Sequence, residues 1–497
     1  MDRVNRSKQA RSDRSITGGS DFLQLDVREA PPGGLSDWLA GRLRQAVSDG
    51  QLPVGTRLPA TRVLAADLRV SRGVVTEAYQ RLIEDGHAAG RGRLGTIVVA
   101  APVAAPPPAR PGPPPAPFAS DPGADAFDAL RAAPARIDLT PGLPDLAAFP
   151  RAAWLRAERS VLSTLRTSGL GYGDPHGTPE LRRAVAGWLA RNRGVRVDPA
   201  EVVIVAGTAQ ALGLIARVLA ATGVTGIAVE DPGSLGTRQH LEHWGMRTPP
   251  VPVDAAGIRV DALRGTGAPA VLLTPAHQFP TGAVLAGDRR RDLMDWGGLI
   301  IEDDYDAEHR YDRPPVPALH SMLPERVFYA GSVSKLLAPA LRIGWVIAPP
   351  PYRDALVAAK RFADLGNAAL PQLVLARLME SGEMERRLRL VRRRHRRRRD
   401  AMIDAIRSRM PGATVHGAAA GLHLTITFDS PVPAAALAAA ALDRGVKVHP
   451  LSWHRRLPGP EGLVLGYAAT PPAAIAEAVA TLAETIESHS MGTGDAT

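Results

Sequence analysis

Residues 331–347 read GSVSKLLAPALRIGWVI, and this segment decides how the larger part of the chain is interpreted. It follows an apolar, strand-like VFYA, and the hydroxyl residues Ser332 and Ser334 stand beside one lysine, Lys335. A lysine that forms an imine must be held close to its carbonyl partner, in surroundings that lower its pKa. The two hydroxyls and Arg342, seven residues on, could bind a phosphate dianion beside it. For this segment alone, a surface loop with an ordinary lysine is the simpler interpretation.

Two earlier segments change that balance. The sequence IEDDYD at 301–306 places carboxylates at the end of a buried-looking strand, where α/β sheets bind ligands. An aspartate buried opposite a pyridine nitrogen keeps that nitrogen protonated, and a nearby tyrosine can hydrogen-bond the ring's phenolate oxygen. At 205–212, VAGTAQAL leads from a strand through Gly207 into a helix, whose free N–H groups suit an anion. Each segment alone could be a helix cap or a turn, but their order and spacing together favour a cofactor site.

Apolar, strand-like runs alternate with helical patterns around these segments. The runs lie at 201–206, 226–230, 270–274, 298–302, 326–330 and 343–348. Such alternation predicts an α/β domain with a largely parallel sheet. Further runs at 422–428 and 463–468 predict a smaller α+β part towards the C-terminus.

A smaller module precedes this domain. Residues 58–83, LPATRVLAADLRVSRGVVTEAYQRLI, have the pattern of two short helices, and a further helix is expected at 35–49. The first of the pair spans about 60–68, and Ser71 stands at the N-cap of the second after a tight turn. Two helices joined in this way form a helix-turn-helix, whose second helix can enter the major groove. Its first turn offers Ser71 and Arg72 to phosphates and base edges.

A wing is expected after these helices. Residues 90–98, GRGRLGTIV, look like a Gly/Arg turn that runs into a strand, with Arg91 and Arg93 at the tip. A small helical bundle used for dimerisation is the alternative to DNA binding. The arginines of the wing and the Ser71–Arg72 pair favour DNA.

The module resembles the GntR-type winged helix. The matching pieces are LPVGTRLPATR (52–62), LAADLRVSR (64–72), AYQRL (78–82) and GRLGT (92–96). The resemblance implies DNA contacts from Arg62, Ser71, Arg72, Gly92 and Arg93, with Arg57 as a weaker candidate.

Bulk properties narrow the remaining possibilities. A chain of 497 residues is too long for one ordinary core, so two or more domains are expected. Cysteine is absent, which excludes a disulfide framework, a thiolate metal site and a cysteine nucleophile, and no metal site is predicted. Neither an apolar run of 18 residues nor a secretory signal is present, so a cytoplasmic location is expected. The formal charge of +10 permits a nucleic-acid partner, although GC-rich coding alone can produce this composition.

One change in composition divides the chain. Residues 101–117, APVAAPPPARPGPPPAP, favour extended polyproline II, and the stretch that follows lacks a clear amphipathic period. We therefore predict a flexible tail at 1–20, a DNA-binding domain at 21–100, a Pro-rich linker at 101–136 and a larger domain at 137–490. The large part of that domain is expected at about 170–350, and its small C-terminal part at about 395–490.

Residues 137–490 resemble the fold-type I, aminotransferase-class pyridoxal-phosphate proteins. The matching pieces are YGDPHGTPELRRAV (172–185), the 207–212 turn, EDPG (230–233), TPAHQFPTG (274–282), IEDDYDAEHRY (301–311) and GSVSKLLAPALRIGW (331–345). A GntR-type winged helix joined to such a domain by a long linker is the architecture of the MocR family of regulators. The resemblance covers nearly the whole chain.

The resemblance implies a role for each matching residue. Lys335 would form the Schiff base with pyridoxal phosphate (the internal aldimine), Asp303 would pair with the pyridine nitrogen, and Tyr305 would meet the phenolate oxygen. The phosphate would be held by Thr208 and Ala209 through their backbone, and by Ser332, Ser334 and Arg342. Tyr172 would reach the same pocket, from its own or from the other subunit of a dimer, and His277 or Gln278 would line the ring pocket.

Three departures from the aminotransferase pattern bear on function. Phe279 stands where the usual N-P-T-G motif has asparagine, and Ser234 stands where many relatives have an aromatic residue. Val464 occupies the place of the arginine that grips the substrate carboxylate. Arg455 or Arg456 could substitute for that arginine, and the sequence does not choose between them. The missing clamp makes sensing of the cofactor a better interpretation than amino-acid turnover.

An arginine-rich tract at 386–399, RRLRLVRRRHRRRR, carries ten arginines in fourteen residues. A second nucleic-acid patch is one interpretation. The leucines at 388 and 390 indicate one partly buried helix face, so a solvated face of a helix is the favoured interpretation of the arginines.

Together these observations predict a transcription regulator that forms a dimer, with domain swapping as one arrangement, and that binds an operator in double-stranded DNA. Pyridoxal phosphate, or its adduct with an amine or amino acid, would shift its DNA-binding modules by binding two arrangements with different affinity. Control of vitamin B6 synthesis is the first candidate pathway, and an amine or amino-acid operon is the second. The alternative is a working aminotransferase with an accessory DNA-binding module.

Overall fold

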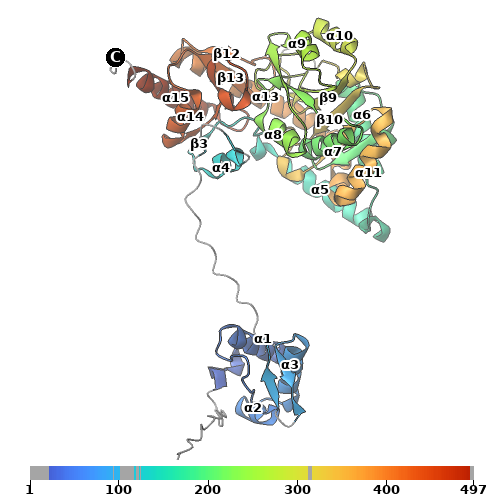
Figure 1. Ribbon diagram of the computed structural model, residues 1–497, viewed down its shortest axis with the longest axis vertical. Helices are drawn as coiled ribbons and strands as arrows, with labels where there is room; N and C mark the ends of the chain where they lie inside the picture. Colours follow the sequence, from blue (N-terminus) through green and yellow to red (C-terminus); the bar gives the residue numbers. More distant parts are fainter. Residues whose placement is uncertain are drawn as a thin grey trace, which may run out of the picture. The chain divides into compact units, whose positions relative to one another are not determined.

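The computed structural model describes residues 22–92, 95–100, 117–118, 122–123, 125–311 and 316–492. The chain forms two compact units, divided between residues 112 and 113 (Figure 1). No helix in the described residues is long and apolar enough to cross a membrane.

The N-terminal unit consists of three helices and a β-hairpin. Its elements are the 3-10 turns Phe22–Gln24 and Val27–Glu29, α1 (Leu35–Ser48), α2 (Thr61–Asp67), α3 (Arg72–Glu84), β1 (Ala88–Gly90) and β2 (Thr96–Val98). The strands pair antiparallel, with Gly90 opposite Thr96. Apolar residues at helical spacing, among them Leu39, Leu43 and Val75, build its core. This arrangement confirms the winged helix-turn-helix expected from the sequence.

The large part of the second unit is built on an eight-stranded sheet of order β4-β11-β10-β9-β8-β5-β6-β7. The strands are β4 (Val202–Val205), β5 (Ile227–Asp231), β6 (Pro250–Asp254), β7 (Gly257–Ile258), β8 (Ala270–Leu273), β9 (Leu299–Asp304), β10 (Val327–Ser332) and β11 (Gly344–Ile347). The five strands from β10 to β6 are parallel, whereas β11 runs antiparallel to both of its neighbours. The predicted α/β fold with a largely parallel sheet is confirmed.

Helices cover both faces of this sheet, because alternate strand residues point to opposite sides. On one face, Val203 and Val205 pack with α7 and α11, and on the other Val202 and Ile204 pack with α5, α6 and α12. The helices are α5 (Arg151–Thr164), α6 (Pro179–Arg193), α7 (Thr208–Ala221), α8 (Leu235–His243), α9 (Val260–Gly265), α10 (Gly287–Trp296), α11 (Arg353–Asp364) and α12 (Ala369–Glu380).

The small C-terminal part is an α+β layer with its own core. Its four-stranded sheet has the order β12-β13-β16-β15, and a short parallel pair joins β14 to β3. Its elements are β3 (Ile137–Asp138), α13 (Glu383–Arg409), β12 (Thr414–His416), β13 (His423–Phe428), α14 (Ala434–Asp443), β14 (Val446–Lys447), β15 (His449–Pro450), β16 (Glu461–Gly466) and α15 (Pro472–Gly492). The predicted smaller α+β part is thereby confirmed.

Part of the predicted linker is folded. Residues Ala126–Ala132 form the helix α4, and its buried residues Ala126 and Leu130 pack against Leu235 and Trp453. Those partners lie more than a hundred residues away, so the local sequence pattern did not reveal the helix. Residues 101–116 of the predicted linker lie outside the described residues.

The arginine-rich tract belongs to α13. The solvated helix face expected from the sequence accounts for only about half of its arginines. Arg387 and Arg398 are buried, and Arg394 and Arg398 each form an ion pair with the buried Asp145 at 3.0 Å. Leu388 is buried as expected, whereas Leu390 is 43% exposed. Much of the tract therefore fastens α13 to the rest of the domain.

Candidate cofactor site and DNA-binding surface

A cavity of about 590 Å³ opens beside the carboxyl ends of the central parallel strands. This edge of an α/β sheet is where ligands bind, and the volume is typical of small-molecule sites. Eight of the ten predicted cofactor residues line it: Lys335, Asp303, Tyr305, Ser332, Ser334, Arg342, Thr208 and Ala209. The structure thus brings together residues that lie up to 134 positions apart in the chain.

Lys335 follows the end of β10 and points into the cavity. Its Nζ donates a hydrogen bond of 2.6 Å to the carbonyl oxygen of Gly142. Burial lowers the pKa of Lys335, while the carboxylates of Asp306 and Asp303 act in the opposite direction. Gly142 has a φ of 85°, and a Cβ at this position would lie 3.0 Å from Nζ, so the close approach requires glycine. A lysine held in this way is suited to form an imine.

Asp303 lies near the end of β9 and faces the same cavity. Its buried Oδ1 has no hydrogen-bond partner among the described residues. Burial, together with the nearby carboxylates of Asp304 and Asp306, raises the pKa of Asp303 to about 7. A buried acceptor without a donor costs free energy, so a cationic N–H group placed here would stabilise the ionised form. A protonated pyridine nitrogen is such a donor.

An anion cradle lies beside Lys335. Gly207 is the N-cap residue of α7 and has a φ of 85°. A Cβ added at this position would lie 3.4 Å from the Arg342 guanidinium. Thr208 and Ala209 start the helix, so their N–H groups are free of helical partners. The Arg342 guanidinium is held by the carbonyl oxygen of Ala206. Together with Ser332 and Ser334, these groups fit a phosphate dianion.

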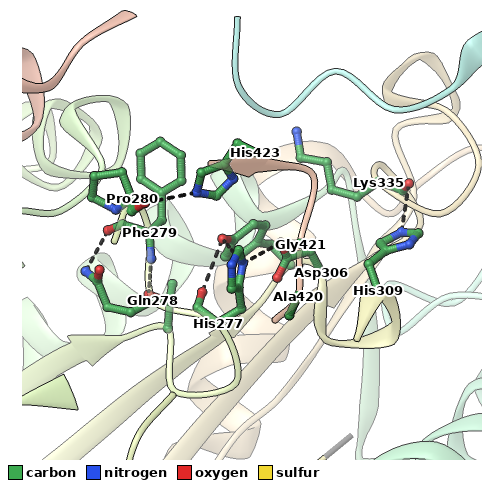
Figure 2. Close-up of polar contacts among 12 residues, drawn as sticks. His277, Gln278, Phe279, Pro280, Asp306, His309, Lys335, Ala420, Gly421 and His423 are labelled. Atoms are coloured by element: carbon green, nitrogen blue, oxygen red, sulfur yellow. Dashed lines mark hydrogen bonds and ion pairs between the residues drawn. The ribbon is translucent and has the colours of Figure 1, made fainter. Parts of the chain in front are cut away.

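His277 lies behind Tyr305 and does not line the cavity, contrary to one expectation from the sequence. Its Nδ1 is 3.1 Å from the Tyr305 hydroxyl and 2.9 Å from Asp306 Oδ2, and the hydroxyl donates to the carbonyl oxygen of His277. Figure 2 shows His277 beside Asp306, with Lys335 across the site. His277 and Asp306 therefore fix the orientation of the Tyr305 hydroxyl.

Gln278 also lies outside the cavity lining. Its side-chain amide donates to the carbonyl oxygen of Pro232 and accepts from Thr281. Gln278 therefore holds the turn that follows it, while Phe279, in the place of the usual asparagine, is a wall of the cavity.

In the N-terminal unit, the predicted DNA contacts lie at the start of α3 and on the hairpin. Ser71 has the extended backbone of an N-cap, but its side chain makes no capping hydrogen bond, and it is exposed. Arg72 is exposed, and its Nε donates to Thr61 at 3.2 Å. Arg62, Arg57 and Gly92 are also exposed, and Arg93 lies outside the described residues. The helix start thus presents a hydroxyl and a guanidinium on the surface that a major groove would meet.

Comparison with known proteins connects both units to one family. The model for bacterial regulatory proteins of the gntR family matches residues 35–98, and that for class I and II aminotransferases matches 137–482. The probable rhizopine catabolism regulatory protein MocR of Rhizobium meliloti is 32% identical over 89% of this chain and 91% of its own length. The chain belongs to the MocR type of GntR-family transcription regulators. The pyridoxine biosynthesis regulator PdxR of Corynebacterium glutamicum is 30% identical over 90% of this chain and 94% of its own length.

The second unit of this MocR-type regulator has the fold of catalytic aminotransferases. The multiple-substrate aminotransferase of Thermococcus profundus superposes with a TM-score of 0.66 and 29% identity, covering 73% of the regulator and 93% of the enzyme. Because the fold is shared, differences from these enzymes at the position of the substrate carboxylate bear directly on function.

The predicted loss of the carboxylate clamp agrees with the side chains around β16. Val464 is buried and does not line the cavity. Arg455 is paired with Glu461, and Arg456 with Glu242 and Thr248. Neither arginine lines the cavity, so neither takes over the role that the sequence left open for it.

Tyr172 does not reach the cavity of its own chain. Its side chain is 96% exposed in the single chain. A place in the cavity of a second subunit therefore stays a prediction.

Several residues that sequence reasoning missed line the far side of the cavity. They are Phe127, Arg131, Arg238, Lys447, His449 and His454, and we call this region the outer end. Burial lowers the pKa of His449 to about 3 and that of His454 well below its ordinary value. These residues come from α4, α8 and the small C-terminal part, and no local motif links them.

Proposed function

We propose that this MocR-type regulator binds pyridoxal phosphate covalently on Lys335 and that the bound cofactor acts as its ligand or co-effector. The observation that carries the proposal is the unpartnered Asp303 carboxylate, which faces Lys335 across a cavity with an anion cradle at its side. The three features fit the pyridine nitrogen, the aldehyde and the phosphate of one molecule. When bound, the cofactor supplies an electrophilic carbon that reacts with amines.

The residues of the chain would divide the work as follows. Asp303 would keep the ring nitrogen protonated, and the Tyr305 hydroxyl, which donates to the His277 carbonyl oxygen in the structure, would turn its proton to the ring oxygen. Arg342, the two serines of the 331–347 segment and the start of α7 hold the phosphate. Sensing is favoured over turnover because the position of the carboxylate arginine is a buried valine, Val464.

We infer that the functional unit is a cytoplasmic homodimer that binds an operator through two winged helices. Tyr172, exposed in the single chain, would complete the cavity of the other subunit. The regulated pathway is vitamin B6 synthesis, as the name of the PdxR relative suggests, or a catabolic operon for an amine or amino acid, since the name of the MocR relative gives rhizopine catabolism as its pathway.

The test uses the purified full chain and a DNA fragment from upstream of its own gene. Addition of pyridoxal phosphate is expected to produce a visible absorption band and to change the affinity for the fragment. Failure to bind the fragment with and without cofactor would contradict the regulator, and repeated conversion of an amino acid to a keto acid would favour the aminotransferase.

The same assay places the DNA contact. Arg72→Ala is expected to weaken specific binding by about 1–3 kcal/mol, because a guanidinium at the start of a recognition helix reads base edges. Arg247→Ala, an exposed arginine of the other unit, is the control and should bind as the wild type does. Equal binding by Arg72→Ala would mean that α3 does not read the operator.

A further inference from the structure

We propose that Lys360 and Asp364 are positioning residues that hold the anion cradle in the shape that accepts the cofactor's phosphate, without touching the phosphate themselves. The inference rests on the proposed function, because it assigns a role to the residues behind the cradle. Both residues belong to α11, which packs beside α7, and neither lines the cavity. They would therefore act through the start of α7 and through Arg342.

Lys360 is a buried lysine whose ammonium has three close acceptors. Its side chain is 0% exposed, and Nζ donates to Asp364 Oδ1 and Oδ2 at 2.5 and 2.7 Å and to Asn367 Oδ1 at 2.6 Å. An ammonium carries three N–H groups around one point, whereas the guanidinium of arginine is planar. The chain has only four lysines, although lysine and arginine together number 60. A lysine at this position therefore matches the arrangement of the acceptors and not only a need for positive charge.

One branch of hydrogen bonds leads from Asp364 to the start of α7. Asp364 Oδ2 also accepts from Gln210 Nε2 at 2.7 Å, and Gln210 Oε1 accepts from the backbone N–H of Ala206 at 2.8 Å. Gln210 is the third residue of α7, the position at which a capping box uses glutamine to accept from the backbone before a helix. Because the N-cap residue is Gly207, no side chain caps the first N–H groups of the helix. The branch thus fixes the peptide before the cradle and leaves the cradle itself open to an anion.

The other branch leads from Lys360 to Arg342. Asn367 accepts from Lys360 with Oδ1, and its Nδ2 donates to the carbonyl oxygen of Arg342 at 3.4 Å. Arg342 has a φ of 49° and a ψ of 47°, a left-handed conformation that costs free energy for a residue with a Cβ. Its guanidinium donates to the carbonyl oxygen of Ala206, where the first branch ends. Both parts of the cradle are therefore tied to the same buried ammonium.

The simpler explanation is that the Lys360–Asp364 pair only stabilises the last turn of α11. The two residues are four positions apart on the helix, and the Asp364 side chain is 32% exposed. In that case loss of the pair would lower stability and would weaken the binding of every ligand of the cavity to the same degree. A positioning role instead requires that the binding of the phosphate group is weakened in particular.

The experiment compares pyridoxal phosphate with pyridoxal, which lacks the phosphate, on the purified full chain. Absorbance titration measures both dissociation constants, and their ratio reports the contribution of the cradle. We expect Lys360→Met and Gln210→Leu each to lower this ratio by about tenfold, the scale of one misplaced hydrogen bond to a charged group, and to leave the affinity for pyridoxal unchanged. Because both substitutions interrupt the branch that ends at Ala206, the double variant should lose much less than the two losses combined.

Arg353→Met is the matched control, since it breaks another ion pair of α11, that with Glu201 at 2.8 Å. It should keep the wild-type ratio. An unchanged ratio in Gln210→Leu would overturn the inference even if Lys360→Met did not fold, and so would an equal loss of affinity for both compounds. A wild type that forms no absorption band with pyridoxal phosphate would overturn the proposed function and this inference with it, whereas a normal band with an unchanged ratio would overturn this inference alone.

Discussion

The two ends of one cavity differ in what they share with aminotransferases. At the inner end, around Lys335, Asp303 and Arg342, the groups that suit a phosphorylated pyridine lie together, on a fold that the regulator shares with a multiple-substrate aminotransferase. At the outer end, the position of the substrate arginine is the buried Val464, and the polar groups come from α4, α8 and the β14–β15 segment. If the inner end binds the cofactor as proposed, one fold can keep the site for a reactive cofactor while the site for the molecule that reacts with it changes independently.

The largest expected effect is at the inner end. Lys335→Ala should abolish covalent attachment of the cofactor, because no other lysine lies at the end of β10. Absorbance and mass after borohydride reduction measure the attachment. Lys447→Met, at the outer end of the same cavity, should still attach the cofactor. Attachment to another lysine in Lys335→Ala would erase the distinction between the two ends.

The next effect tests whether the outer end lacks only one arginine. Val464→Arg would bury a charge without a partner in the four-stranded sheet, and we expect a loss of stability on the order of 3 kcal/mol or more. Urea unfolding measures the loss, and Val54→Arg, at a 57% exposed position, should unfold as the wild type does. If the Val464→Arg variant instead converted amino acids to keto acids, the absence of that one arginine would be the whole difference between the outer end and the substrate site of an aminotransferase.

A pH dependence is expected from the inner end in the cofactor-free protein. Burial raises the pKa of Asp303 from 3.8 to about 7, so this group lowers stability as the pH rises from about 4 to about 7. Asp303→Asn lacks that loss, and its stability relative to the wild type should grow over this range, by at most about 4 kcal/mol. Urea unfolding at pH 5 and pH 8 measures the difference. The exposed Asp292→Asn should show no such trend. If the difference in stability between Asp303→Asn and the wild type did not change with pH, Asp303 would be ionised over the whole range.

The smallest expected effect concerns His277, which supports the Tyr305 hydroxyl. His277→Leu removes the ring nitrogen that lies 3.1 Å from the Tyr305 hydroxyl but keeps the backbone carbonyl to which that hydroxyl donates. Affinity for pyridoxal phosphate should fall a few-fold, or by about 1 kcal/mol, with a shifted absorption maximum. The exposed His243→Leu should leave both unchanged. An unshifted band in His277→Leu would show that the backbone alone orients Tyr305.

The sequence predicts well what depends on local pattern. The six strand-like runs correspond to β4, β5, β8, β9, β10 and β11, because a buried strand is a short apolar run wherever it lies. The inner end was predictable for a related reason. Lys335 follows a strand, Asp303 lies near the end of one and Thr208 opens a helix, and parallel strands end at one edge of the sheet.

Features that depend on distant partners escaped prediction. The arginines of α13 look solvated until Asp145, about 250 residues earlier, is seen between Arg394 and Arg398. The place of His277 behind Tyr305 depends on Asp306, which is its partner only once β8 and β9 lie side by side. The outer end has no motif, because its lining is assembled from three separate parts of the chain.

The helix α4 is held against the rest of its unit by a small buried surface. Only Ala126 and Leu130 are fully buried in it, and burial of one such leucine contributes about 1.5–3 kcal/mol. Coupling free energies between a ligand and a conformational equilibrium are typically about 1–3 kcal/mol. Phe127 of the same helix lines the cavity, and its ring centroid lies 5.3 Å from that of His449, so a ligand that changed the contacts of this ring would be expected to change the stability of α4 by a comparable amount. A helix with a larger buried face would be less sensitive to such a change.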